Sequence, residues 1–222
     1  MSIALSLGNN LTTGGIFKPT AVNNTSVNNV TDFAGIAGGA TLVLLSTQTA
    51  SASANISFTT GIDSTYDEYV FKFINIHPSV QEHFTFNFST DGGSNYNVTK
   101  TSTLFRAYHD EADTATGLVY ETSADLAQST SYQFLEYGRT GSSDSRDSVS
   151  GYMQLFNPSD TTYVKHFIGV LNNRFDEASI YSIQNYVAGY GNTTSAINAV
   201  DFKFASGNID DGIIKMYGVA KS

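Results

Sequence analysis

The chain has 222 residues and a formal net charge of −9, and only 14% of its residues are charged, against roughly 25% in an average globular domain. A negative chain without a Lys/Arg cluster is not expected to bind a nucleic-acid backbone, and the absence of any apolar run of about 18 residues argues against membrane insertion. No basic region followed by a hydrophobic stretch opens the sequence, so no secretory signal is expected, and without Cys there are no disulfides or thiolate metal sites.

Residues 1–40 are rich in Gly, Asn and Thr and carry almost no charge. They offer too little contiguous apolar surface to offset the entropy of ordering, so this segment is not expected to fold alone. Two interpretations remain open: an unstructured tail, or an extended N-terminal arm that lies along a neighbouring subunit. Apolar residues recur along the segment and favour the arm, in which we expect Phe17, Val22, Val27 and Phe33 to be buried in assembly contacts.

From Thr41 onward the sequence predicts β-strands. Residues 68–76 read EYVFKFINI, residues 83–89 read HFTFNFS, and residues 201–205 read DFKFA. Strict alternation of aromatic and polar residues is typical of strands with one buried face. In HFTFNFS the polar positions are Thr85 and Asn87. Seven phenylalanines are expected to point into the core: Phe71, Phe73, Phe84, Phe86, Phe88, Phe202 and Phe204.

Further strands are predicted at 41–47, 54–60, 96–109, 117–121, 131–137, 148–157, 161–171, 181–190 and 212–219. Turn residues such as Asp91-Gly92-Gly93 separate them. The one predicted helical turn is 123–129 (SADLAQS). Twelve short strands without helical crossovers predict an all-β fold, an antiparallel β-sandwich of jelly-roll-like type over residues 41–222.

Few residues indicate chemistry. The segment His109–Asp113 (HDEAD) is the densest group of metal-binding side chains. It lacks the helical spacing of a zinc protease and the glycine-anchored spacing of a calcium loop, so a solvated loop is the preferred interpretation. Glycoside hydrolysis needs two carboxylates roughly 5–10 Å apart, and the sequence does not pair Glu68, Glu82, Glu121 and Glu136. We therefore expect no catalytic residue, no cofactor and no bound metal.

Tyrosine is the remaining lead, because ten tyrosines exceed what one core can bury. Exposed Tyr beside Asn, Ser and Thr can stack on sugars or pack in protein interfaces. The alternative is that half of them lie at the sandwich edges with their hydroxyls in water. The ten are Tyr96, Tyr108, Tyr120, Tyr132, Tyr137, Tyr152, Tyr163, Tyr181, Tyr186 and Tyr190.

Four stretches carry a family resemblance: TLVLLSTQTASASANISFTTGIDSTYDEYVFKFINIHPS at 41–79, DGGSNY at 91–96, FNPSDTTYVKHFIG at 156–169 and FASGNIDDGIIKMYG at 204–218. In this order they resemble a family of small structural proteins encoded by tailed bacteriophages, notably marine podoviruses of cyanobacteria and related hosts. In that family a strand–Gly–strand segment ending in a Leu/Met-Tyr-Gly motif closes the β-domain. The resemblance covers residues 41–219 and excludes the first 40 residues.

The resemblance implies a non-enzymatic virion structural protein, located in the virion, and supplies no catalytic motif. Capsid decoration and a place in the tail or fibre both remain open. Expected partners are copies of the same chain, with a trimer as one option, and other virion proteins. The alternative is a carbohydrate-binding module of the phage tail, which would recognise a host surface glycan through exposed Tyr and the acidic loop around His109. A glycan-cleaving enzyme ranks below both. A surface with few charges lowers the desolvation cost of assembly contacts.

Overall fold

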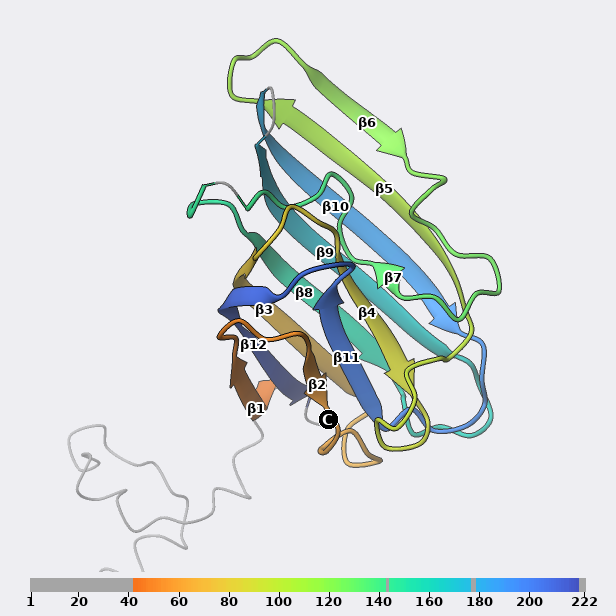
Figure 1. Cartoon of the computed structure of the whole chain (residues 1–222). Helices are drawn as coiled ribbons and strands as arrows, with labels where there is room; N and C mark the ends of the chain where they lie inside the picture. Colours follow the sequence, from red (N-terminus) through yellow and green to blue (C-terminus); the bar gives the residue numbers. More distant parts are fainter. Residues whose placement is uncertain (1–41, 143, 177–178, 220–222) are drawn as a thin grey trace, which may run out of the picture. The chain divides into compact units, whose positions relative to one another are not determined.

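The computed structural model describes residues 42–142, 144–176 and 179–219. These residues form twelve strands and no helix (Figure 1). The strands are β1 (Leu42–Thr49), β2 (Ile56–Phe58), β3 (Glu68–Pro78), β4 (Phe84–Ser89), β5 (Lys100–Asp110), β6 (Thr116–Tyr120), β7 (Gln133–Phe134), β8 (Val149–Phe156), β9 (Lys165–Asp176), β10 (Ile180–Gly191), β11 (Ala199–Phe204) and β12 (Ile209–Val219). The predicted arm, with Phe17, Val22, Val27 and Phe33, lies outside the described residues and stays a prediction.

The strands form two antiparallel sheets. The larger sheet has eight strands in the order β1-β12-β3-β8-β9-β10-β5-β6, and the smaller has four in the order β2-β11-β4-β7. Figure 1 shows the smaller sheet lying over one part of the larger sheet, which continues beyond it toward β5 and β6. The all-β antiparallel sandwich predicted from the sequence is confirmed. Within the described ranges there is also no helix long and apolar enough to cross a bilayer.

Eight of the strands pair in a nested order. When β5, β6, β9 and β10 are set aside, the first strand pairs with the last, and each following strand pairs one step further inward: β1 with β12, β2 with β11, β3 with β8, and β4 with β7. All four of these pairs are antiparallel. The remaining four strands extend the larger sheet beyond the nested pairs.

Phenylalanine side chains fill the space between the two sheets. Phe202 on β11 lies at the centre, with its ring centroid 5.2 Å from Phe71 and 5.1 Å from Phe73, both on β3 of the opposite sheet. Phe84 and Phe86 on β4 approach the same ring at 6.1 and 6.5 Å. All seven phenylalanines predicted to point inward are at most 2% exposed, which confirms the prediction.

Strand β4 is buried on both faces, whereas the alternating pattern predicted burial on one face only. Thr85 donates to the Lys203 carbonyl at 2.8 Å. Asn87 donates to the carbonyls of Tyr96 and Thr130 at 2.7 and 2.9 Å. The loops on either side of β5 and β6 therefore cover this polar face. Alternation shows which face is apolar, but it cannot show whether a connecting segment covers the other one.

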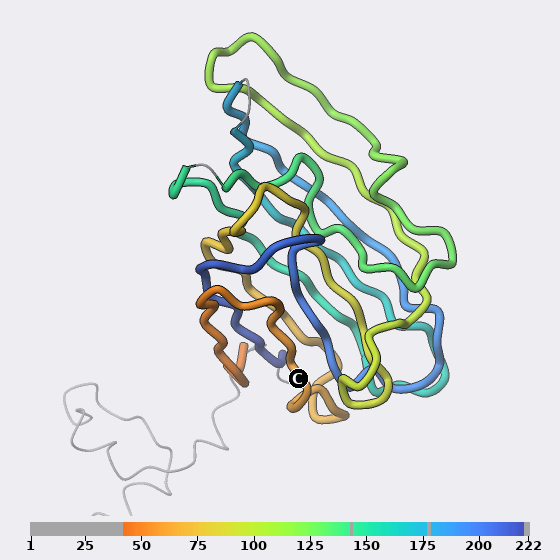
Figure 2. The backbone as a smooth tube through the Cα atoms, in the orientation of Figure 1, coloured from red at the N-terminus to blue at the C-terminus, as the bar shows by residue number. Residues whose placement is uncertain are grey.

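The connection after β6, residues 121–138, covers the extension of the larger sheet, and we call it the covering segment. It first follows β5, where Lys100 and Ser129 exchange backbone hydrogen bonds of 2.8 and 3.0 Å. It then crosses the inner face, where the Tyr137 N–H donates to the side-chain oxygen of Asn185 on β10 at 2.8 Å. Figure 2 shows it as the green tube that leaves β6 and returns over the sheet. The helical turn predicted at 123–129 is wrong, because backbone groups of this stretch bond to β5 rather than to one another.

Strand β12 lies between β1 and β3 and contains the strand–Gly–strand segment noted in the sequence. Gly212 has φ +123°, and a Cβ there would lie 2.7 Å from the Asn75 carbonyl oxygen. The pairing register of β12 with β3 shifts on either side of Asp211. Glycine is required at this position because the backbone of β3 approaches it closely and φ is positive.

Phe86→Ala is expected to lower the free energy of unfolding by about 3–5 kcal/mol, because it opens a cavity among packed rings. The Phe86 ring lies 4.9 Å from Phe88 and 5.0 Å from Phe167. Equilibrium denaturation in urea measures the loss. Phe105→Ala is the matched control, since Phe105 is 40% exposed on the other face of the larger sheet, and its loss should be about 1 kcal/mol. Equal losses in the two variants would contradict this assignment of the core.

Candidate functional site

The outer face of the larger sheet, which packs against neither the smaller sheet nor the covering segment, carries a row of large side chains. Strand register places Tyr120, Phe105, Tyr186, Val170 and Tyr152 directly opposite one another on β6, β5, β10, β9 and β8. Directly opposite residues of antiparallel strands share a face. We call these five residues the aromatic row. Its four aromatic members are 38–49% exposed.

Two rings of the aromatic row hold each other in place. Phe105 and Tyr186 stack with their centroids 4.9 Å apart and their planes at 10°. A cross-strand aromatic pair of this kind contributes about 0.5–1.5 kcal/mol beyond the area that it buries. The row is therefore an ordered, exposed apolar surface.

A groove of about 450 Å³ lies beside the aromatic row on the same face. Its floor is the next row of side chains, Thr103, Ala188 and Ile168, which are in register on β5, β10 and β9. Its far wall includes Tyr190 and His166, whose rings lie 6.1 Å apart. The groove exists because short side chains stand between rows of larger ones. We call it the outer-face groove.

The outer-face groove combines an apolar floor with neutral polar groups. Among its lining residues are the hydroxyls of Thr101, Thr103 and Tyr190 and the imidazole of His166, and none is Asp, Glu, Lys or Arg. Ligand sites commonly pair an apolar surface with a few polar groups that set orientation. The groove is suited to a neutral ligand that has both an apolar face and hydroxyl groups.

Several of the tyrosines that the sequence showed in excess are exposed in the structure. All ten tyrosines named from the sequence are partly or fully exposed. The structure brings Tyr120, Tyr152 and Tyr186 together in the aromatic row, but it leaves Tyr163, 70% exposed, in the loop between β8 and β9. Sequence reasoning missed Phe105 and Ala188. The alternation of each strand could have placed these two residues on the outward face. It could not have shown which residues of other strands lie beside them.

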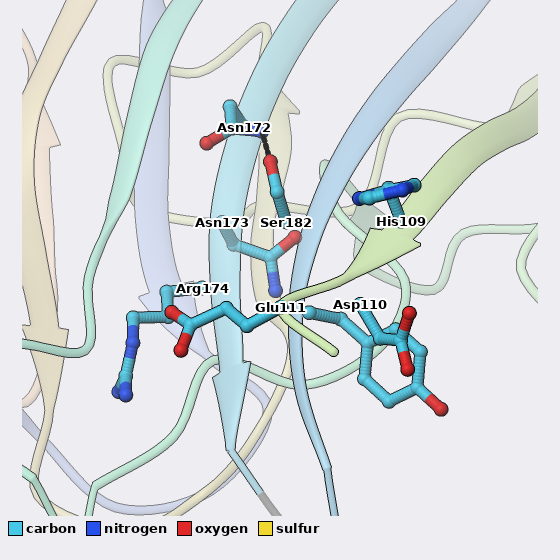
Figure 3. A pocket seen from close by; sticks show the side chains of 8 residues that line it. His109, Asp110, Glu111, Asn172, Asn173, Arg174 and Ser182 are labelled. Atoms are coloured by element: carbon cyan, nitrogen blue, oxygen red, sulfur yellow. Dashed lines mark hydrogen bonds between the residues drawn. The ribbon is translucent and has the colours of Figure 1, made fainter. Parts of the chain in front are cut away.

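The His109–Asp113 group does not converge on one point. His109 and Asp110 are consecutive strand residues and point to opposite faces, so His109 is exposed while Asp110 is buried (Figure 3). His109 contacts Asp113 at 3.1 Å. The Asp110 carboxylate accepts hydrogen bonds from the hydroxyl and N–H of Thr114 and from the Ala115 N–H, which lower its pKa. Asp110 thus closes the turn between β5 and β6.

A small cavity of about 220 Å³ lies beside this turn, lined by residues at the ends of β5, β9 and β10. Figure 3 shows its side chains, with Asn172 donating to Ser182 at 3.0 Å. Arg174, also in the lining, forms ion pairs with Asp144, Asp147 and Asp176. In residues 42–142, 144–176 and 179–219 no group of three or more His, Asp and Glu side chains is arranged to hold a metal ion.

The four glutamates weighed as a catalytic pair take part in separate contacts. Glu68 accepts a hydrogen bond from Gln154 at 2.8 Å, and Glu121 pairs with Arg106 at 2.5 Å. Glu82 and Glu136 both lie beside residue 83: the N–H of His83 donates to Glu82, and that of Phe84 donates to Glu136, each at 3.0 Å. None of the four lines the outer-face groove.

His83 and Glu136 form a buried polar site that no sequence pattern indicated. The His83 ring stacks between Phe134 and Tyr137, at 4.5 and 5.2 Å, and its Nδ1 lies 4.0 Å from the Glu136 carboxyl oxygen. Burial lowers the pKa of His83 to about 4 and raises that of Glu136 to about 8. Both groups are therefore predominantly neutral at pH 7. The hydrogen bond from the Phe84 N–H to Glu136 joins β4 to the covering segment.

Lys100 is another buried ionisable group. Its ammonium donates to the side-chain oxygen of Asn87 at 2.5 Å and to the Val98 carbonyl at 2.8 Å. Burial lowers its pKa to about 7. These bonds hold the start of β5 against β4 and the loop that follows β4. Lys100 does not line the outer-face groove.

Comparison with known proteins finds no match: no family model, no curated protein and no solved structure matches this chain. The resemblance to phage structural proteins therefore rests on the four sequence stretches alone.

Glu136→Gln is expected to change how stability depends on pH. The folded chain holds the Glu136 proton more tightly than the unfolded chain, so this group's stabilising contribution is complete below about pH 4.5 and is lost as pH rises through about 8. The free energy of unfolding of the variant should equal that of the wild type near pH 4.5. At pH 9 it should exceed the wild-type value by about 2–4 kcal/mol. Denaturant titrations across this range measure the difference.

Glu111→Gln is the control, because it removes the same charge from an exposed position. The same denaturant titrations on this variant measure the effect of removing a surface charge alone. If Glu136→Gln behaves in the same way, Glu136 is ionised in the folded protein and the assigned pKa direction is wrong.

Proposed function

We propose that this chain is a non-enzymatic structural protein of a tailed-bacteriophage virion, either a capsid decoration protein or a component of the tail or fibre. It would assemble through residues 1–40 and through surfaces of the sandwich. The observation that carries the proposal is the exposed aromatic row, which crosses five strands of the larger sheet. A contiguous exposed apolar surface of this kind commonly indicates a binding or assembly site.

The chemistry of the face supports assembly. Its rows consist mainly of aromatic, aliphatic, Thr and His side chains, and burying such groups costs far less than burying ionised ones. The four resembling stretches also support the proposal, since they cover β1 to β3, the turn after β4, the β8–β9 region and β12. Finding the chain by mass spectrometry of purified particles tests the proposal, and its copy number separates shell decoration from the tail.

Removal of residues 1–40 is expected to leave the β-sandwich folded and to prevent incorporation into particles. An extended arm of this length reaches roughly 130 Å, enough to cross a neighbouring subunit, and would become ordered only on assembly. Circular dichroism checks the fold, and mass spectrometry of particles checks incorporation. A protein beginning at Thr41 that enters particles at the normal copy number would show that these residues have no assembly role.

Point substitutions in the full-length chain test whether the apolar side chains of residues 1–40 are needed, or only the presence of the segment. Changing the four apolar residues to Ser should reduce incorporation as strongly as the truncation, while changing four neighbouring Asn residues to Ser should not. The apolar set is Phe17, Val22, Val27 and Phe33, and the control set is Asn9, Asn10, Asn23 and Asn24.

A carbohydrate-binding module that recognises a host surface glycan is the second candidate function. The outer-face groove favours it, because Tyr190 and His166 stand beside hydroxyl groups and an apolar floor. Aromatic rings can pack against the apolar face of a sugar while neighbouring polar groups bond its hydroxyls. The acidic loop around His109, which was expected to take part in glycan recognition, lies at the ends of the strands and does not line the groove.

Ala188→Phe fills the floor of the groove and is expected to lower affinity for a glycan at least about tenfold, which corresponds to about 1.4 kcal/mol. A glycan array with the wild-type protein identifies the ligand, and calorimetry compares the variants. Tyr163→Ala is the control, since this exposed tyrosine lies outside the groove. If the wild type binds no glycan on the array, the second candidate is wrong and the virion proposal is unaffected.

A further inference from the structure

Among the described residues, strand β6 is an open edge of the larger sheet. It reads TGLVY, pairs with β5 on one side, and stands last in the strand order (Figure 1). Leu118 is 72% exposed, and Val119 and Tyr120 are also exposed. Edge strands are usually protected from pairing by charged residues, proline or a bulge. The five residues of β6 include no charge and no proline, and the β5–β6 register runs without a shift.

The other sheet edges of the described residues differ from β6. Strand β1 carries a register shift between Leu44 and Ser46, and such irregularity disrupts regular pairing. In the smaller sheet, the edge strands β2 and β7 have only three and two residues. Among the four edges, β6 is therefore the one that combines a regular ladder with an unprotected sequence.

The hydrogen bonds between β5 and β6 show which groups of the edge are free to pair. The Glu121 N–H donates to the Leu104 carbonyl at 2.9 Å, and the Asp110 N–H donates to the Ala115 carbonyl at 3.0 Å. Hydrogen-bonding direction alternates along an antiparallel strand, so residues 115, 117, 119 and 121 face β5. The backbone groups of Thr116, Leu118 and Tyr120 consequently point away from the sheet.

We propose that two copies of this chain pair antiparallel through β6, with a two-fold axis at Leu118. Leu118 then lies opposite Leu118 of the partner subunit, and Thr116 lies opposite Tyr120 of the partner subunit. By symmetry Tyr120 also lies opposite Thr116 of the partner subunit. Each of the resulting three pairs is a hydrogen-bonded one, in which two residues exchange both of their N–H to carbonyl bonds. The interface is isologous, because the same strand supplies both halves.

The occupant is a second copy because the edge is complementary to itself. The three outward-pointing residues are centred on Leu118, so a two-fold axis there aligns every free donor with a free acceptor. The same axis places the two most apolar outward side chains, both Leu118, side by side on the outer face. An axis perpendicular to the sheet also puts the outer faces of both copies on one side, where each Tyr120 lies beside Thr116 of the partner subunit.

The biological role of this pairing rests on the proposed assembly function. The contact itself can be measured on the purified protein. The edge is short, so the contact is weak in dilute solution and is strengthened where copies are held close together. Each copy also carries a net charge of −9. Added salt screens the repulsion between copies, and self-association should therefore increase with ionic strength.

Leu118→Cys tests the register. Opposite residues of a hydrogen-bonded pair have Cα atoms about 5.5 Å apart, within the range of about 4.4–6.8 Å that a disulfide can bridge. The natural chain has no Cys, so any covalent dimer reports the introduced residue. Under mild oxidation of the concentrated full-length protein, Leu118→Cys is expected to form disulfide dimers at least about tenfold faster than the controls.

Two cysteine controls accompany it. Val119→Cys lies opposite Gly117 of the partner subunit, so its two copies are diagonal neighbours about 7–8 Å apart, too far for ready bridging. Tyr163→Cys is as exposed as Leu118 but lies far from β6 in sequence, and it measures random collision. Equal rates for Leu118→Cys and Tyr163→Cys would overturn the pairing, and faster bridging of Val119→Cys would overturn its register.

Sedimentation of the cysteine-free protein gives a second readout. The wild type is expected to self-associate with rising concentration, and Leu118→Lys should abolish this by placing two like charges opposite each other. Thr103→Lys, on the same face but on β5, should still associate. A wild type that remains monomeric at every concentration and salt level would overturn the proposal. Failure of pairing, with incorporation into particles still dependent on residues 1–40, would leave the virion function standing.

Discussion

The contact on which the rest of the structure depends is the packing of phenylalanine rings around Phe202. This ring meets Phe71 and Phe73 from the larger sheet and Phe84 and Phe86 from its own sheet. Side chains alternate between the two faces of a strand, so a slip of one residue would move all of these rings to the opposite face. The cluster therefore fixes both the register of the core strands and the inward face of each sheet.

The orientation set by the core passes outward through the larger sheet. Because Phe71 and Phe73 point inward on β3, Lys72 between them points outward, and Tyr152 lies opposite Lys72 on β8. Register then carries the outward orientation across β9, β10 and β5 to β6. The aromatic row, the groove and the outward side chain of Leu118 are thus consequences of the same packing. The proposed binding face and the proposed pairing edge belong to one continuous sheet.

Burial of polar groups follows from the connections rather than from the strands. The covering segment encloses Glu136 and, with β4, His83, while the loop after β4 encloses Lys100. Burial shifts their pKa values toward the neutral forms. These groups tie the covering segment and the β4–β5 loop to the sheets, which keeps one face of the extension closed while the outer face stays free to bind.

The sequence by itself determined the strands, the all-β class and the inward phenylalanines, because alternation within a strand is a local property of consecutive residues. It could not determine that Phe105 stacks on Tyr186, that β4 is covered on both faces, or that residues 123–129 follow β5 instead of forming a helical turn. Each of these depends on which distant segment lies alongside. The excess of tyrosine was visible in the composition, but its grouping into one exposed row was not. Pairing between strands far apart in the chain decides such neighbours, and only the tertiary structure fixes that pairing, since the energy that selects it comes from the shared core rather than from any one segment.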